Sequence, residues 1–227
     1  MNERDRRAAS FVREMIDRGV LTFGDFVLKS GRESPYFFNL GEIADGAGLA
    51  ALGSAYAVET LALPSRPEVL FGPAYKGIPI ATATAIALAR DHGVGIGAAF
   101  NRKEVKDHGE GGHLVGAAMA GRKVAIVDDL VTDGTAKREA FETITDAGGE
   151  VVGVVLALDR QEPSTDGTGT AVEVLEHGFE VPVRCVATLD DVVDFVQDDA
   201  RFADRRDALV AHRTMVRVRG GAGSSYS

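Results

Sequence analysis

The sequence has little of several features that define large classes of proteins. It contains one cysteine, Cys185, so no disulfide can form within the chain. Its five histidines form no cluster with the spacing of a metal site. No apolar run approaches the roughly 20 residues that a helix needs to cross a bilayer, and the first residues, MNERDRRAAS, lack the apolar core of a signal peptide. We therefore expect a cytoplasmic protein that does not bind membranes.

An excess of basic residues is also absent. The 25 Lys and Arg residues stand against 34 Asp and Glu residues, which gives a formal charge of -9. This balance disfavours broad electrostatic binding to nucleic acid or to anionic lipid. Any site for a phosphate must therefore be local.

The length and hydrophobic content indicate one globular domain. The chain has 227 residues, of which 45% are hydrophobic, enough to bury a full core. We expect a single domain over residues 1–216, with an N-terminal hood up to about residue 65 and an α/β core over 66–200. Residues 217–227, rich in Gly and Ser, are expected to be a flexible tail.

Apolar periodicity predicts alternating helices and strands after a different N-terminal section. In that section we expect a helix over 4–18, two short strands near 23–28 and 36–38, and a helix over 46–63. Further strands are predicted at 69–71, 94–100, 124–128, 151–158 and 183–188, and helices at 78–90, 135–147, 189–196 and 202–215. Residues 163–170 are expected to be a flexible excursion. Helices between most of the strands indicate right-handed crossovers, hence a mainly parallel sheet with its ligand at the carboxyl ends of the strands.

The most informative stretch is VAIVDDLVTDGTA, from Val124 to Ala136. A doubly buried strand runs into two carboxylates and then into a Gly-containing turn that opens a helix, and such a turn is a natural anion site. Asp128 and Asp129 point to opposite faces of a regular strand, so a proton-sharing pair is not expected. As hydrogen-bond acceptors beside a phosphate, they suit the hydroxyls of a sugar. The stretch contains neither a Walker A motif nor G-x-G-x-x-G.

Other polar segments are predicted at the same edge of the sheet. A Gly-bounded loop over 72–77 carries Lys76 and suits a second anion. The Gly-rich loop over 101–116 carries separable cations and has the character of a lid, although an ordinary solvated loop is the alternative. Arg160 follows a strand and could bind a carboxylate through two parallel hydrogen bonds, or pair with a nearby acid.

Five blocks of this sequence, taken together, resemble the orotate phosphoribosyltransferase family. They are LKSGRESPYFFN, GPAYKGIP, NRKEVKDHGEGG, VDDLVTDGTA and LDRQE, and they cover roughly residues 23–162. VDDLVTDGTA alone resembles the phosphoribosyl-pyrophosphate motif shared by type I phosphoribosyltransferases. The lid block and LDRQE resemble the orotate family and not the purine enzymes.

The resemblance implies a fold and a reaction. The fold is the type I phosphoribosyltransferase fold, a Rossmann-like, mainly parallel sheet flanked by helices with a small N-terminal hood. The reaction transfers a phosphoribosyl group from phosphoribosyl pyrophosphate to orotate, with Mg2+, in pyrimidine synthesis. The resemblance also implies a homodimer in which the lid of one subunit closes over the neighbouring site.

Matching the family's motifs onto this chain gives the predicted site residues. The predicted catalytic residues are Lys76, Arg102, Lys103, Lys106, His108, Asp128 and Asp129. Binding of phosphoribosyl pyrophosphate is predicted for these seven and for Tyr75, Leu130, Val131, Thr132, Asp133, Gly134, Thr135 and Ala136. Orotate binding is predicted for Lys29, Phe37, Phe38, Thr132 and Arg160. No dedicated metal residue is predicted, because Mg2+ prefers phosphate, hydroxyl and water oxygens here.

Two other functions remain open from the sequence. One is a regulator that senses phosphoribosyl pyrophosphate without transferring it, which would be expected to carry a DNA-binding element or a basic face. The other is a phosphoribosyltransferase for a different nucleobase. Arg160 distinguishes orotate from a nucleobase without a carboxylate, because only a substrate carboxylate would use the two parallel hydrogen bonds that this arginine can donate.

Overall fold

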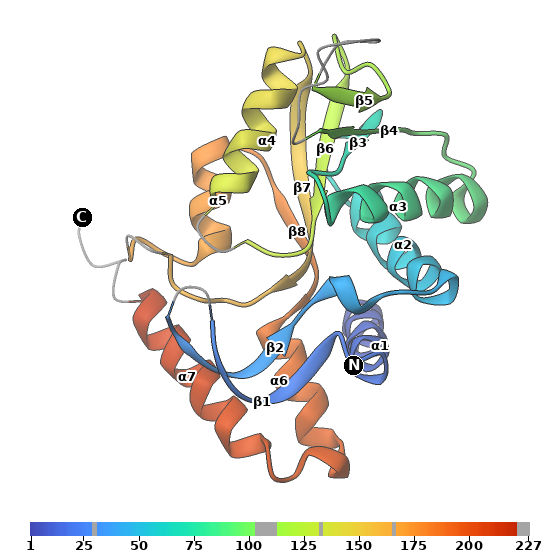
Figure 1. Cartoon of the computed structure of the whole chain (residues 1–227). Coiled ribbons are helices and arrows are strands. Elements are labelled where there is room, and N and C mark those ends of the chain that lie inside the picture. The colour runs from blue at the N-terminus through green and yellow to red at the C-terminus, as the bar shows by residue number, and fades with distance from the viewer. Residues whose placement is uncertain (29–30, 103–112, 132–133, 165–166, 222–227) are drawn as a thin grey trace.

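The computed structural model describes residues 1–28, 31–102, 113–131, 134–164 and 167–221, with only the backbone described for 219–221. A six-stranded sheet runs through its centre in the order β5-β4-β3-β6-β7-β8 (Figure 1). Its parallel strands are β3 (Val69–Phe71), β4 (Gly97–Asn101), β6 (Lys123–Asp128), β7 (Glu150–Asp159) and β8 (Val183–Thr188). The predicted mainly parallel α/β fold is confirmed.

The edge strand β5 (Leu114–Gly116) corrects the predicted loop over 101–116. It pairs antiparallel with β4, and Asn101 at the other end of that loop belongs to β4 itself. Two short strand segments therefore close the base of the loop. Leu114, Val115 and Gly116 are too few to show a period, which is why the sequence pattern missed them.

The central strands are buried on both faces, as their continuous apolar sequences predict. Alternate residues point to opposite sides, so Ala125 and Val127 of β6 join one core, whereas Val124 and Ile126 join the other. Helices cover both faces, which explains why no polar alternation is visible in these strands (Figure 1).

The two layers of helices differ in size. The larger core packs α1 (Glu3–Asp17), α2 (Gly46–Leu61), α3 (Gly77–His92) and α6 (Leu189–Asp198). The smaller core packs α4 (Thr135–Asp146) and α5 (Ala171–Phe179). Helix α5 was not predicted from the sequence. Its signal is the capping box of Thr170 and Glu173, whose side chains bond each other's backbone N–H groups.

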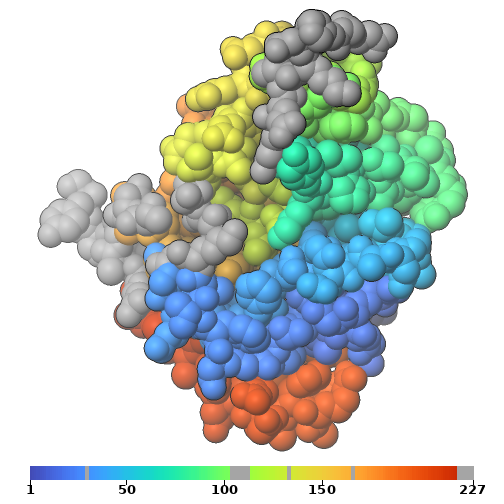
Figure 2. Space-filling model, viewed as in Figure 1, coloured from blue at the N-terminus to red at the C-terminus, as the bar shows by residue number. Residues whose placement is uncertain are grey.

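The N-terminal hood is a hairpin joined to the end of the chain. Strands β1 (Leu21–Val27) and β2 (Glu33–Phe38) are antiparallel, and helix α7 (Arg206–Gly221) packs against β2. In the space-filling view this N-terminal section (blue) lies directly between the C-terminal helices (red) and the core (Figure 2). The hood is thus built from both ends of the sequence.

Helix α7 also corrects the predicted tail. It extends to Gly221, beyond the domain end predicted at residue 216. Leu209, His212 and Val216 form its buried stripe. The excursion predicted over 163–170 is closed by a β-bridge between Pro163 and Thr170. Two short 3-10 helices, η1 (Leu40–Glu42) and η2 (Ala200–Phe202), complete the described elements. In the described part of the chain no helix has the length and apolar character to span a membrane.

Candidate active site

The loops that follow β3 and β6 meet at the carboxyl edge of the sheet. Lys76 Nζ, in the loop before α3, donates to Asp129 Oδ2 at 2.9 Å. Strands β3 and β6 are direct parallel neighbours, so their carboxyl ends lie side by side. The two predicted anion-binding turns therefore share one rim, as the sequence analysis expected.

Glycines make the tight path of the Lys76 loop possible. A Cβ atom on Gly72 would lie 2.0 Å from the carbonyl oxygen of Gly77, and a Cβ on Gly77 would lie 2.5 Å from the carbonyl carbon of Gly72. Only hydrogen fits at both positions. The loop then exposes Tyr75, which is 65% accessible, and leaves Lys76 half exposed at the rim.

The base of the predicted lid is joined to this loop. Asn101 Oδ1 accepts a hydrogen bond from the backbone N–H of Ala74 at 2.8 Å. The backbone N–H of Arg102 donates to His113 O at 2.7 Å across the closed base. The sequence analysis missed Asn101, although its place at the end of a strand was a usable signal. Lys103, Lys106 and His108 lie outside the described residues.

Asp128 and Asp129 have separate cationic partners, in agreement with their predicted opposite directions. Asp128 is buried, and Lys137 Nζ donates to its Oδ2 at 2.5 Å. Lys137 also donates to the carbonyl oxygen of Leu130. Burial raises the pKa of Asp128, while the charge of Lys137 opposes that rise. Asp129 instead faces Lys76 and accepts from the backbone N–H of Leu130 at 2.8 Å.

Lys137 is a residue of this site that the sequence analysis missed. It lies one turn into α4, and its side chain is 5% accessible because it crosses back to the end of β6. A lysine in a helix pattern ordinarily marks the solvent face. Only its position nine residues after Asp128, across the turn, could have suggested an inward path.

The predicted phosphate turn opens a helix where the sequence places it. Helix α4 begins at Thr135 after Gly134, whose φ of 77° is in the left-handed region that favours glycine. The backbone N–H groups of Lys137 and Arg138 bond back to the oxygen of Gly134 at 3.1 and 2.9 Å. Thr135 and Ala136 are exposed, Leu130 is half-buried and Val131 is buried. Thr132 and Asp133 lie outside the described residues.

Arg160 lies just past the end of β7, beneath the hood. Its Nη2 atom is 2.6 Å from Glu162 Oε1, and its guanidinium carbon is 5.3 Å from the centre of the Tyr36 ring. Arg160 therefore does pair with a local acid, the alternative that the sequence left open. Even so, its Nε atom is buried and has no hydrogen-bond partner among the described residues.

Phe37 and Phe38, which are predicted to bind orotate, follow Tyr36 on β2 and differ in burial. Phe38 is 6% accessible, whereas Phe37 is 43% accessible and packs against Phe26 with ring centres 5.5 Å apart. Neighbouring strand residues point to opposite sides, which explains the contrast. Lys29 lies outside the described residues.

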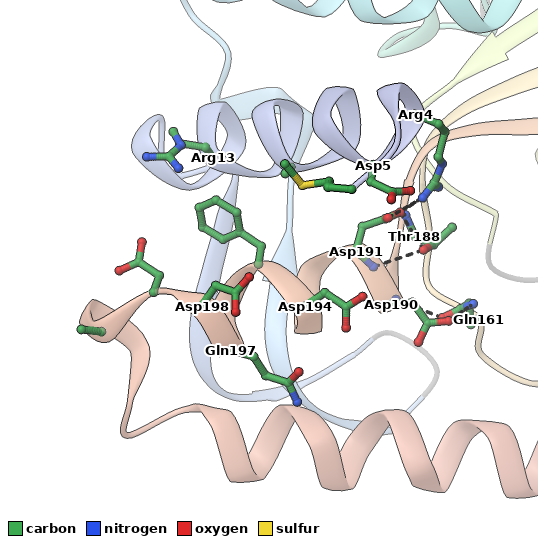
Figure 3. Close-up of a pocket in the computed structure, with 15 residues that line it drawn as sticks. Arg4, Asp5, Arg13, Gln161, Thr188, Asp190, Asp191, Asp194, Gln197 and Asp198 are labelled. Carbon is green, nitrogen blue, oxygen red and sulfur yellow. Dashed lines mark hydrogen bonds and ion pairs between the residues drawn. The ribbon is translucent and has the colours of Figure 1, made fainter.

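Acidic groups elsewhere do not form a metal centre in the described residues. The pocket of about 910 Å³ between α1 and α6 contains many aspartates (Figure 3). Several are already paired: Arg4 binds Asp191, and Arg217 binds Asp190 at 2.6 Å. At the rim, Asp129 offers a carboxylate with 17% side-chain exposure. One carboxylate fits a Mg2+ ion that takes most of its oxygens from a phosphorylated ligand.

Comparisons with known proteins agree with this geometry. The family model for the phosphoribosyl transferase domain matches residues 39–190. The orotate phosphoribosyltransferase of Pseudomonas syringae is 49% identical over 203 residues, covering 89% of this chain and 94% of the relative. The orotate phosphoribosyltransferase structure from Francisella tularensis aligns with a TM-score of 0.80 and 36% identity, covering 91% of this chain and 98% of that one. The Mycobacterium tuberculosis enzyme in complex with 5-phospho-alpha-D-ribosyl 1-diphosphate aligns with a TM-score of 0.62 and 26% identity, covering 82% and 98%. By the match to the family model and the identity to these relatives over most of its length, this chain belongs to the orotate phosphoribosyltransferase family.

Proposed function

We propose that this protein transfers the 5-phosphoribosyl group of phosphoribosyl pyrophosphate to orotate, forming orotidine 5'-phosphate and pyrophosphate in pyrimidine (UMP) synthesis. The observation that carries the proposal is the 2.9 Å contact between Lys76 and Asp129, which brings the two anion-binding turns onto one rim. A donor with a phosphate at one end and a pyrophosphate at the other needs that adjacency. The names of the relatives of this chain, together with the Mycobacterium tuberculosis enzyme in complex with 5-phospho-alpha-D-ribosyl 1-diphosphate, supply the identity of the substrates.

Different residues of the rim would bind the two ends of the donor, according to the charge of each end. The turn at Gly134 and Thr135 presents the start of α4 to the 5'-phosphate. Asp129 accepts hydrogen bonds from ribose hydroxyls. Asp128, which is paired with Lys137, lies next to it at the same edge of the sheet. Lys76 and Asp129 form an ion pair across the rim. The donor would replace this contact, so that Lys76 faces the pyrophosphate and Asp129 faces the sugar.

Catalysis by these residues would be mainly electrostatic. As the bond from the ribose C1 to pyrophosphate breaks, positive charge develops on the sugar and negative charge on the departing oxygens. Lys76 and Arg102 would stabilise the leaving group, and the predicted lid would add Lys103, Lys106 and His108. Bound Mg2+ would neutralise further negative charge on the pyrophosphate. The lid's sequence, with three Gly residues among its cations, is compatible with closure over the bound donor.

The resemblance also supports a homodimer in which each lid serves the neighbouring site. We include this assembly in the proposal, and light scattering on the purified protein tests it directly. A monomer at assay concentrations would refute the shared lid. The predicted cytoplasmic location stays a prediction.

Arg160 provides the test of the acceptor. We expect wild-type protein with Mg2+ and phosphoribosyl pyrophosphate to deplete the ultraviolet absorbance of orotate. Replacing Arg160 by Ala removes the proposed bidentate partner of the orotate carboxylate, and charged hydrogen bonds contribute about 1.5–3 kcal/mol each. We therefore expect kcat/KM for orotate to fall by about 100-fold or more.

Uracil, which lacks the carboxylate, is the matched substrate control. Any weak activity on uracil is expected to be unaffected by Arg160→Ala, so the preference for orotate should collapse. If the preference survives, Arg160 does not bind the carboxylate. If folded wild-type protein consumes no orotate, the proposed function itself is wrong, and a phosphoribosyltransferase for another nucleobase becomes the candidate to assay.

A further inference from the structure

The turn that carries Arg160 is held in an unfavourable backbone conformation. Gln161 has a φ of 52°, a left-handed value that strains the backbone of a residue other than glycine. Three hydrogen bonds fix it. Its backbone N–H donates to Asp159 Oδ1 at 2.8 Å, its Nε2 donates to Asp190 Oδ2 at 3.0 Å, and its Oε1 accepts from the backbone N–H of Asp190 at 3.2 Å. Figure 3 shows this contact of Gln161 with Asp190 at the start of α6.

The consequence of this turn is that Arg160 and Glu162 come together. Their side chains meet at 2.6 Å between Nη2 and Oε1, and both are largely buried, with 9% and 14% side-chain exposure. Arg160 and Glu162 lie on either side of the restrained Gln161, and the guanidinium of Arg160 lies against Tyr36 of the hairpin.

Glu162 has a second cationic neighbour on the hairpin. Arg32, in the turn between β1 and β2, brings its Nη1 atom 3.8 Å from Glu162 Oε2 and donates from the same atom to Pro163 O at 2.8 Å. One buried carboxylate therefore lies between two arginines from separate parts of the chain. It links the hairpin, which carries Phe37 and Phe38, to the loop that carries Arg160.

The remaining neighbours of Arg160 bring no compensating charge. Tyr36 lies under the guanidinium, and burial raises the pKa of its hydroxyl. His212 of α7 meets the Tyr36 ring edge-on, with centres 5.8 Å apart. Burial, together with the charge of Arg160, lowers the pKa of His212 to about 4, so its ring is neutral near pH 7. Among the described residues, Glu162 is the carboxylate in ion-pair contact with this arginine.

We propose that Glu162 is a positioning residue for acceptor recognition: it orients Arg160 toward a substrate carboxylate and, through Arg32, holds the hairpin across from it. This inference rests on the proposed function. Glu162 and the Tyr36 ring restrain the guanidinium from two directions. The N–H groups of Arg160 that Glu162 does not occupy, among them the unpartnered Nε, are then left for the acceptor.

Steady-state kinetics of Glu162→Ala and Glu162→Gln test this role. We expect Ala to raise the KM for orotate by about tenfold or more, because Arg160 loses the partner that orients it. Gln keeps the length and one oxygen that can accept from a guanidinium, so it should restore much of the loss and raise this KM only about threefold. The KM for phosphoribosyl pyrophosphate and kcat are expected to stay within about threefold of wild type for both.

Glu139→Ala is the matched control, because Glu139 is exposed on α4 and far along the chain from this loop. It should leave every constant unchanged. Thermal unfolding verifies that each variant is folded, and Gln serves if Ala is not. An unchanged KM for orotate in both variants, a decrease in that KM, or a parallel increase for both substrates would each overturn the inference. If the wild-type protein does not consume orotate, the proposed function is refuted and this inference with it. If the wild-type protein consumes orotate and the Glu162 variants have the same constants, the inference alone is refuted.

Discussion

Replacing Lys137 by Met should destabilise the protein strongly, because Lys137 is half of a buried ion pair. The Lys137 and Asp128 side chains are 5% and 10% accessible, and their charged atoms are 2.5 Å apart. Met fills most of the space of the lysine stem but leaves the Asp128 carboxylate buried without its cation. Removing one partner of a buried ion pair costs about 3–5 kcal/mol. For a domain of this size, 1 kcal/mol lowers Tm by about 2–4 °C, so we expect a decrease of about 6–20 °C.

The loss should also depend on pH in a defined direction. Burial already raises the pKa of Asp128, and loss of Lys137 removes the charge that opposes that rise. The folded variant then binds a proton more readily than the unfolded chain, so it regains stability as pH falls through the raised pKa. We expect the difference between variant and wild type to be largest near pH 8 and to shrink toward pH 5.

Urea unfolding at several pH values measures this prediction. Lys123→Met is the matched control, because Lys123 is exposed at the other end of β6, and it should change the free energy of unfolding by less than about 0.5 kcal/mol. The double variant Lys137→Met with Asp128→Asn removes the isolated charge and should recover part of the loss. A loss below about 1 kcal/mol for Lys137→Met, constant with pH, would refute this account of the pair.

Two further predictions concern stability. Burial raises the pKa of Asp159 to about 6, so the wild-type protein loses stability as pH rises from about 4 through 6. Asp159→Asn keeps an oxygen that accepts from the N–H of Gln161, and in urea unfolding it should gain on the order of 2 kcal/mol at pH 8 and little at pH 4. An equal effect at both pH values would contradict this prediction. A Cβ on Gly53 would lie 2.3 Å from the carbonyl oxygen of Ala83, so Gly53→Ala should separate α2 from α3 and lower stability by about 1–3 kcal/mol or more in thermal unfolding. The control is Gly46→Ala on the same helix, whose Cβ meets open space and should leave stability unchanged.

The parts of the fold that the sequence revealed are those where one local pattern decides the outcome. The doubly buried strand Val124 to Asp128 and the start of α4 at Thr135 were both predicted, because an apolar run followed by a Gly turn has few alternatives. Segments with weak patterns escaped. Strand β5 has three residues, and helix α5 has nine. The end of α7 was not predicted for a different reason: its last residues lie beyond Val216, where the buried stripe ends.

The candidate site divides in the same way. Lys76, Asp129 and Arg160 could be identified because each follows a strand at the edge where parallel sheets bind ligands. Lys137 and Glu162 could not, because their roles come from contacts between separate segments. Nothing in the one-dimensional pattern tells a lysine that turns inward toward Asp128 from one that faces solvent.

The sequence by itself determined most of the strands and helices and the family, and it predicted the carboxyl edge of the sheet as the place of chemistry. These follow from periodicity and from residue types at strand ends, which are local properties of the chain. Only the tertiary structure decided which charges neutralise each other: Lys76 with Asp129, Lys137 with Asp128, and Arg160 with Glu162. The physical reason is that pairing and burial depend on distances between segments far apart in sequence, and the fold alone sets those distances.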